Sequence, residues 1–119
     1  MMGTDFPYLK KLKKNNIIMP FHWTLDDWPH VGWNVYPKFD YQGNLRSQET
    51  IFEIWKGEFD AEYALDEDCL FDLTMHPQLT GRARMIMMFD RLNQYIKGFP
   101  DAWIATPIEL ARAAQKALS

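Results

Sequence analysis

The 119-residue chain alternates short apolar runs with longer patterns of helical period. The strand-like runs are IIMPFHW at 17–23, CLFDLTMH at 69–76 and AWIAT at 102–106. An amphipathic pattern that is typical of a helix follows each of them, after a long loop in the first case. Such alternation predicts an α/β fold with parallel strands, either an open sheet or part of a barrel. In both architectures, functional side chains gather where strands end at their carboxyl edge.

Capping residues and apolar spacing predict where the helices begin and end. The first helix should begin after Ser47, a good N-cap residue. The second should run from 82 to 98, with Gly98 as its stop, and the third from 107 to 118, with a proline in its first turn. The positions expected to face the core are Ile51, Trp55, Phe59 and Tyr63 in the first helix and Met85, Phe89, Leu92 and Ile96 in the second.

A segment rich in aromatic, proline and glycine residues, 25–44, separates the first strand-like run from the first helix. Its composition predicts an irregular loop. Unstructured loops of about 20 residues are uncommon in compact domains and are often functional. Trp23, Trp28 and Trp33 could form the wall of an apolar cleft that stacks on a sugar ring or a heterocycle.

Composition excludes several classes of function. The 13 basic and 16 acidic residues give a net charge of -3, which argues against a nucleic-acid partner because phosphate binding needs a concentrated basic surface. No apolar stretch is long enough to span a membrane, and no signal peptide is recognisable. Cys69 is the single cysteine, which fits a reducing compartment. We therefore expect one cytoplasmic domain over residues 1–119, with no membrane partner.

The histidines at positions 22, 30 and 76 lack the short spacing of a metal-binding pair such as H-E-x-x-H, so the sequence alone predicts no metal site. His76 stands where the second strand-like run ends, directly before Pro77. An imidazole in that position suits a general acid, because it titrates near neutral pH. The alternative is a structural histidine that is hydrogen-bonded to backbone.

Two adjacent aspartates, Asp26 and Asp27, follow the first strand-like run and precede Trp28. They could form a solvated acidic turn or a helix cap. Alternatively, one carboxylate could orient the histidine or a basic group. Asp72 shares the predicted strand face of His76, but four residues along a strand place it ~13 Å away, so we interpret it as structural.

Four segments carry more specific motifs: WTLDDWP (23–29), WKGEFDA (55–61), LTMHPQLTGR (73–82) and YIKGFPDAWIAT (95–106). Together they resemble the C-terminal part of the polysaccharide deacetylase family, the carbohydrate esterase group with a NodB homology domain. The most similar branch contains peptidoglycan deacetylase-like and cofactor-independent allantoinase-like enzymes. The resemblance implies the C-terminal portion of a distorted (β/α)7 barrel with parallel strands.

Members of this family hydrolyse non-peptide amide C–N bonds, typically in N-acetylated sugars. They use a metal-bound water as nucleophile, an aspartate base and a histidine acid. The resemblance implies that His76 of LTMHP is this acid. It also implies that Asp26, Asp27 and Trp28 of LDDWP support the site and form part of its wall, next to a sugar or small-molecule substrate.

The chain departs from the family pattern in one large respect. The family's metal ligands, a TFDDG-like aspartate and an H-x-x-x-H-like histidine pair, have no counterpart here, and no motif supplies the aspartate base. We therefore expect no cofactor in this chain, although a divalent, zinc-like metal belongs to the complete family enzyme. The chain alone should be inactive. A partial barrel exposes strand edges, which predicts self-association or a complementary N-terminal half. The alternative is a catalytically inactive remnant or scaffold module.

Overall fold

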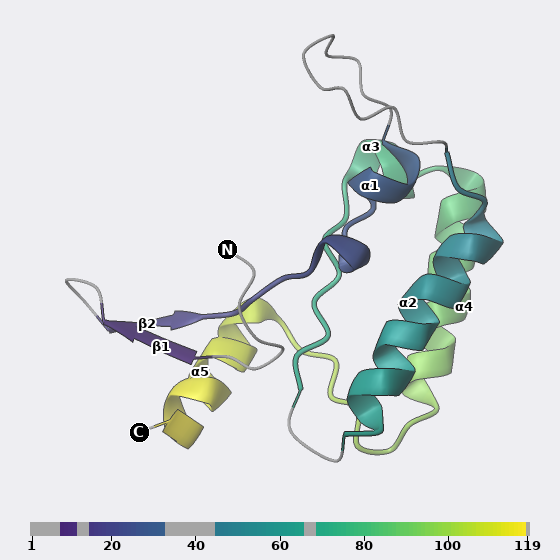
Figure 1. The fold of residues 1–119 in the computed structure, drawn as a ribbon. Helices are drawn as coiled ribbons and strands as arrows, with labels where there is room; N and C mark the ends of the chain where they lie inside the picture. Colours follow the sequence, from purple (N-terminus) through teal and green to yellow (C-terminus); the bar gives the residue numbers. More distant parts are fainter. Residues whose placement is uncertain (1–7, 12–14, 33–44, 66–68, 119) are drawn as a thin grey trace, which may run out of the picture.

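The computed structural model describes residues 8–11, 15–32, 45–65 and 69–118 (Figure 1). A pair of long helices lies side by side on one side of the molecule, and a small hairpin with the last helix lies on the other. In chain order the elements are β1 (Tyr8–Lys11), β2 (Asn15–Ile18), the 3-10 helix η1 (Trp23–Leu25), α1 (Trp28–Val31), α2 (Gln48–Tyr63), α3 (Pro77–Thr80), α4 (Ala83–Lys97) and α5 (Pro107–Leu118).

Helix α2 begins where its cap predicts. The Ser47 side chain accepts a hydrogen bond from the Thr50 backbone N–H at 3.2 Å, which satisfies one of the free donors of the first turn. The helix buries Ile51, Trp55 and Phe59, so the expected core face is confirmed at these three positions. It is wrong at Tyr63, which is 40% exposed.

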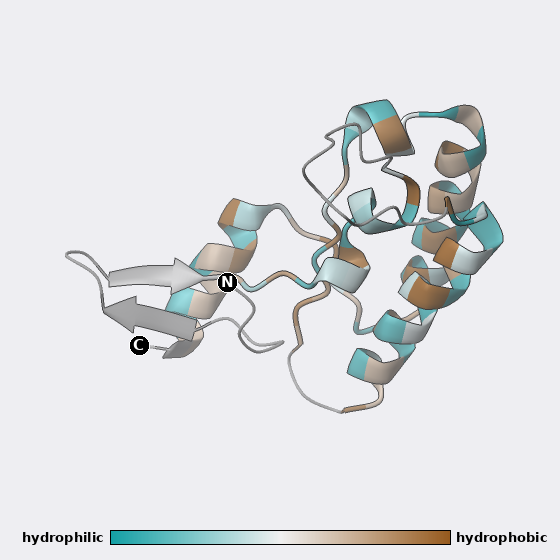
Figure 2. Cartoon of the chain, turned by 45° about the horizontal axis from the view of Figure 1, so that its top comes forward, coloured by the Kyte–Doolittle hydropathy of each residue, from teal (hydrophilic) through white to brown (hydrophobic). Residues whose placement is uncertain are grey.

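Helix α4 packs against α2 and completes the core. It runs between Arg82 and Gly98, as the sequence predicts, and its backbone ends at the glycine. Hydrophobic and hydrophilic residues alternate along α2 and α4 (Figure 2), as expected for helices with one buried face. The buried residues of α4 are Met85, Met88, Leu92 and Ile96, while Phe89 is partly buried against them.

The described residues do not show the predicted parallel strands, apart from one parallel bridge. The hairpin of β1 and β2 is antiparallel, and β2 contains the first two residues of the run 17–23. The runs 69–76 and 102–106 are extended but form no ladder there, apart from a parallel bridge between Asp26 and Thr74. An extended segment becomes a strand when a neighbour takes up its N–H and C=O groups. The described residues supply too few such neighbours to form a barrel.

The segment 25–44, expected to be an irregular loop, is partly helical. Residues 23–25 form η1 and residues 28–31 form α1, where Pro29 sits in the first turn. Residues 33–44 lie outside the described part of the chain, and with them the third tryptophan of the predicted aromatic wall. Trp23 and Trp28 are both exposed. Within the described ranges, every helix is too short or too polar to cross a bilayer.

Candidate functional site

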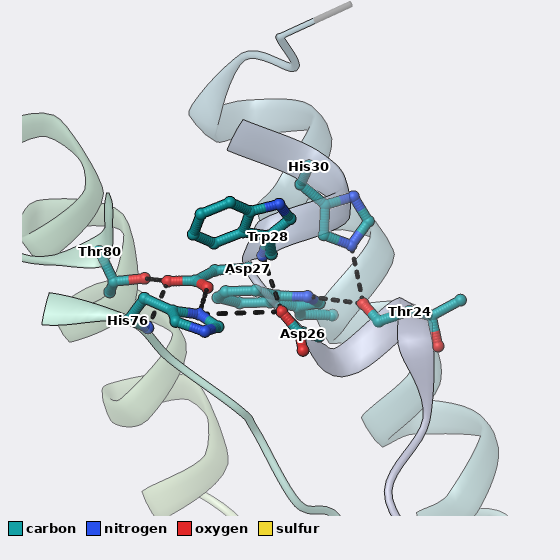
Figure 3. A network of polar contacts seen from close by, with 8 residues as sticks. Thr24, Asp26, Asp27, Trp28, His30, His76 and Thr80 are labelled. Atoms are coloured by element: carbon teal, nitrogen blue, oxygen red, sulfur yellow. Dashed lines mark hydrogen bonds and ion pairs between the residues drawn. The ribbon is translucent and has the colours of Figure 1, made fainter. Parts of the chain in front are cut away.

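The site forms where the end of η1 meets the segment that leads into α3. Asp26 pairs with Thr74 in the parallel bridge. The Asp27 N–H donates to the Thr74 carbonyl at 3.1 Å, and the Thr74 N–H donates to the Leu25 carbonyl at 2.9 Å. This bridge holds two segments together that are distant in the sequence. It brings Asp27, one residue beyond Asp26, next to His76, two residues beyond Thr74 (Figure 3).

The Asp27 carboxylate is completely buried and accepts three hydrogen bonds. Its Oδ1 lies 2.6 Å from Nδ1 of His76. Its Oδ2 accepts the His76 backbone N–H at 2.8 Å and the Thr80 hydroxyl at 2.5 Å. A buried carboxylate needs such partners, because its desolvation is otherwise costly. These donors fix Asp27 in one orientation, with one oxygen directed at the imidazole.

The sequence HPQLT explains why His76 and Thr80 meet the same carboxylate. Pro77 occupies the first position of α3, where its missing N–H is no loss, and His76 is the N-cap. The His76 carbonyl accepts the N–H groups of Leu79 and Thr80, both at 2.9 Å. One helical turn thus places the Thr80 hydroxyl beside His76.

The contact with Asp27 defines the state of the imidazole of His76. A carboxylate can only accept, so Nδ1 carries the proton in this pair. The ring of Trp28 lies at an angle of 65° to the imidazole, with 5.2 Å between the centroids. The His76 side chain is 35% exposed, and its Nε2 makes no hydrogen bond with the described residues. Nε2 is therefore the atom through which this histidine can exchange a proton.

Asp26, unlike Asp27, bonds mainly to the backbone and not to His76. Its Oδ1 accepts the backbone N–H of Trp28 at 2.8 Å, at the start of α1, and lies 4.0 Å from Nδ1 of His76. The sequence left two alternatives for the aspartate pair, a turn or helix cap and a carboxylate that orients the histidine, and the structure assigns one to each residue. Asp26 caps the turn into α1, and Asp27 contacts the histidine.

Asp26, Asp27 and His76 each offer one ligand atom within 4.8 Å of the others, and we tested whether this cluster fits the divalent metal of the family. Nδ1 of His76 donates to Oδ1 of Asp27, and Oδ1 of Asp26 accepts the Trp28 N–H. The carboxylate oxygens keep further lone pairs, but Nδ1 could bind a cation only by giving up its proton and its hydrogen bond to Asp27. As hydrogen-bonded in this structure, His76 therefore does not offer Nδ1 as a metal ligand.

Thr80 and the residues around the Thr24 carbonyl were not predicted from the sequence. Thr80 is predictable in retrospect, because Pro77 marks a helix start that places it one turn from His76. The Thr24 carbonyl accepts Nε2–H of His30 and Nε1–H of Trp55, each at 2.8 Å. This contact joins residues of three elements, and no local pattern indicates it.

Asp72 takes no part in this network. It lies in the same extended segment as His76, and the described residues give it no hydrogen bond or ion pair. Burial raises the pKa of its carboxyl group.

Known proteins share both sequence and fold with this chain, although no protein-family model matches it. The peptidoglycan deacetylase of Helicobacter pylori is 23% identical over 90 residues, which cover 76% of this chain and 30% of that protein. A crystal structure from Mycobacterium smegmatis, assigned as a polysaccharide deacetylase, is 23% identical with a TM-score of 0.82, over 100% of this chain and 41% of that one. A Pseudomonas aeruginosa structure with the same assignment is 20% identical with a TM-score of 0.74, over 95% of this chain and 36% of that one.

The chain thus spans less than half the length of each of these three proteins. Within that span, the arrangement of its helices and extended segments is that of the two crystal structures. The sequence similarity to the peptidoglycan deacetylase and the fold shared with the two crystal structures confirm the predicted resemblance to the polysaccharide deacetylase family.

Proposed function

We propose that this chain supplies the general acid of a deacetylase-type hydrolase that cleaves a non-peptide amide C–N bond. The observation that carries the proposal is the pair formed by buried Asp27 and half-exposed His76, whose Nε2 is free of described partners. Hydrolysis adds a hydroxyl group to the acyl carbon and a proton to the leaving nitrogen. His76 is the group that delivers this proton.

Asp27 supports this step electrostatically. Protonation of Nε2 converts the imidazole into a cation, and the adjacent carboxylate stabilises that charge at a distance of 2.6 Å. When the C–N bond breaks, Nε2–H transfers its proton to the amine, and the electron pair of the broken bond takes up that proton. The ring returns to the neutral form with Nδ1–H still directed at Asp27. The carboxylate keeps the imidazole oriented through the cycle.

The proposed substrate is an N-acetylated sugar or a related linear or cyclic amide. The Helicobacter pylori relative is a peptidoglycan deacetylase by name, which supports an amino-sugar substrate. The exposed indole of Trp28 stands beside the imidazole and offers an aromatic face of the kind that sugar rings pack against. Asp26 keeps Trp28 in place through its hydrogen bond to the Trp28 N–H.

We further propose that activity needs residues beyond this cluster, from a second copy or from a complementary N-terminal half. The described network contains no free carboxylate beside Nε2 that could activate water. The extended segment 102–106 exposes Trp103 and Ile104 by 60% and 58%, which supports an unfilled contact surface. The second candidate function is a catalytically inactive scaffold module. It is favoured because His76 uses Nδ1–H for its hydrogen bond to Asp27 and so does not offer that nitrogen to a metal.

A chimera decides between these two functions. In it, this chain replaces the structurally matching part of the Mycobacterium smegmatis protein, and acetate release from N-acetylglucosamine oligomers is measured. An active chimera should lose about 100-fold or more in rate with His76→Ala, the range that a general acid contributes. His22→Ala is the matched control, because His22 is an exposed histidine whose ring contacts the Thr24 hydroxyl and makes no hydrogen bond with Asp27 or His76. An unchanged rate with His76→Ala would contradict the acid, and a folded but inactive chimera would favour the scaffold.

A further inference from the structure

The backbone carbonyl of Thr24 has lost both of its usual helical partners. In a 3-10 helix it would accept the N–H of Asp27, three residues on, and in an α-helix the N–H of Trp28. Instead, the Asp27 N–H donates to the Thr74 carbonyl at 3.1 Å, and the Trp28 N–H donates to Oδ1 of Asp26 at 2.8 Å. Both of these changes of hydrogen-bond partner are needed to bring Asp27 next to His76.

Two ring N–H groups take the place of these backbone donors. Nε2 of His30 and Nε1 of Trp55 each lie 2.8 Å from the Thr24 carbonyl oxygen, one from α1 and the other from α2. Figure 3 shows the imidazole of His30 directed at the Thr24 carbonyl. Both rings are buried, and they meet edge to face with 6.2 Å between centroids. The carbonyl therefore stays satisfied although its helix ends early.

We infer that His30 and Trp55 are positioning residues for the Asp27–His76 pair. By binding the Thr24 carbonyl, they end η1 at Leu25 and leave the Asp27 N–H free to pair with Thr74. That this positioning serves catalysis rests on the proposed function. That it holds Asp27 against His76 does not. Both ring N–H groups donate to the protein's own backbone, at the Thr24 carbonyl.

A competing backbone conformation explains why loss of the donors would displace Asp27. The carbonyl oxygen has two lone pairs, so loss of either ring donor leaves one of them unpaired in this buried region, which is costly. The carbonyl regains a donor if η1 continues by a residue and the Asp27 N–H turns back to it. That change breaks the bridge to Thr74 and moves the carboxylate away from His76. The other ring nitrogen of His30, Nδ1, is buried without a hydrogen-bond partner among the described residues, so Nε2–H is the polar contact that holds this ring.

The test uses the chain as it is, labelled with nitrogen-15, and two NMR signals. One is the downfield resonance of the His76 Nδ1 proton. The other is hydrogen exchange at the Asp27 amide, measured relative to the Leu92 amide in the core of α4. Trp55→Phe keeps an aromatic ring but removes the N–H, and we expect it to broaden or shift the first signal. Exchange at Asp27 should accelerate by about tenfold more than at Leu92, as for loss of one buried hydrogen bond.

Two further comparisons separate positioning from general stability. His30→Leu should act like Trp55→Phe, whereas His30→Gln, whose amide can donate from the place of Nε2, should restore both signals. Tyr95→Phe is the matched control: it removes a ring O–H that donates to Asp60 at 2.7 Å, away from Thr24. It should leave the ratio of the two exchange rates unchanged.

The inference is overturned if Trp55→Phe and His30→Leu keep the wild-type proton signal and exchange ratio. It is equally overturned if Tyr95→Phe changes them as much. If Trp55→Phe does not fold, the comparison between the two His30 variants decides. None of these measurements needs turnover. An inactive chimera with an intact response to the variants would contradict the proposed function alone.

Discussion

Asp27 and His76, 49 residues apart in the sequence, contact each other twice: the carboxylate accepts both the ring N–H and the backbone N–H of the histidine. The second bond ties the carboxylate to the peptide that carries the ring, so the two side chains cannot move independently. A histidine held in this way has one tautomer and one free nitrogen.

The first prediction concerns the charge on Asp27. Asp27→Asn keeps the shape but removes the negative charge, and only one of its two side-chain polar atoms can still accept a hydrogen bond. In the active chimera we expect acetate release to fall by about 10- to 100-fold, because the imidazolium loses its partner. Asp90→Asn, on the exposed side of α4, is the control and should have no effect. An Asp27→Asn enzyme with the parent rate would show that the carboxylate plays no part.

The hydroxyl of Thr80 should matter for stability. Thr80→Val removes the donor to Oδ2 of Asp27 and keeps the side-chain volume. We expect the free energy of unfolding to fall by about 1–3 kcal/mol, since a buried carboxylate oxygen loses a partner. Urea unfolding followed by tryptophan fluorescence measures this. Thr80→Ser retains the hydroxyl and should lose less; a Thr80→Val variant as stable as the parent would contradict this role of the hydroxyl.

The α2/α4 core should respond to cavity formation. Leu92 is completely buried between the helices, whereas Met87 is largely exposed on the same helix. We expect Leu92→Ala to lower the free energy of unfolding by about 2–5 kcal/mol and Met87→Ala to change it by less than about 0.5 kcal/mol. Comparable effects of the two substitutions would mean that α4 does not pack through the predicted face.

The raised pKa of Asp72 predicts a pH dependence of stability. Burial favours the neutral carboxyl in the folded state, so between the unfolded and the folded pKa the native state binds more protons. Stability from this group is therefore present below the ordinary aspartate pKa of 3.8 and is lost as pH rises through the folded pKa. Asp72→Asn should be more stable than the parent at pH 7, by less than about 1 kcal/mol, but not at pH 3. Unfolding at both pH values tests this, and a gain at pH 3 alone would contradict the sign.

Self-association should depend on the exposed residues of the segment 102–106. The double variant Trp103→Ser and Ile104→Ser removes two large apolar side chains from this surface. We expect it to sediment as a smaller species than the parent chain at the same concentration. Ile86→Ser with Met87→Ser, on exposed positions of α4, is the matched control. A parent chain that stays monomeric at high concentration would contradict the predicted association.

The helices of this protein are predictable from sequence because their signals are local. Ser47 caps α2, Gly98 ends α4, and apolar residues at a spacing of three or four define the faces that meet. The strands are not predictable in the same way. Their apolar runs are present, but a strand also needs a neighbour, and for 69–76 and 102–106 the described chain offers almost none.

The candidate site shows the same division. His76 and Asp27 each follow an apolar run, and that position suggested that they meet; the structure brings them into contact, while their catalytic roles stay predictions. The hydrogen bonds from His30 and Trp55 to Thr24 arise from tertiary packing of three elements. No spacing in the sequence encodes such a contact, so sequence patterns could not reveal it.

The protonation state of the His76 ring tests the central claim most directly. Nitrogen-15 NMR of the histidine-labelled chain distinguishes the two neutral tautomers by the shifts of the ring nitrogens. The pair with Asp27 predicts that the neutral ring carries its proton on Nδ1 and that Nε2 carries none. A neutral ring protonated on Nε2 would contradict the account.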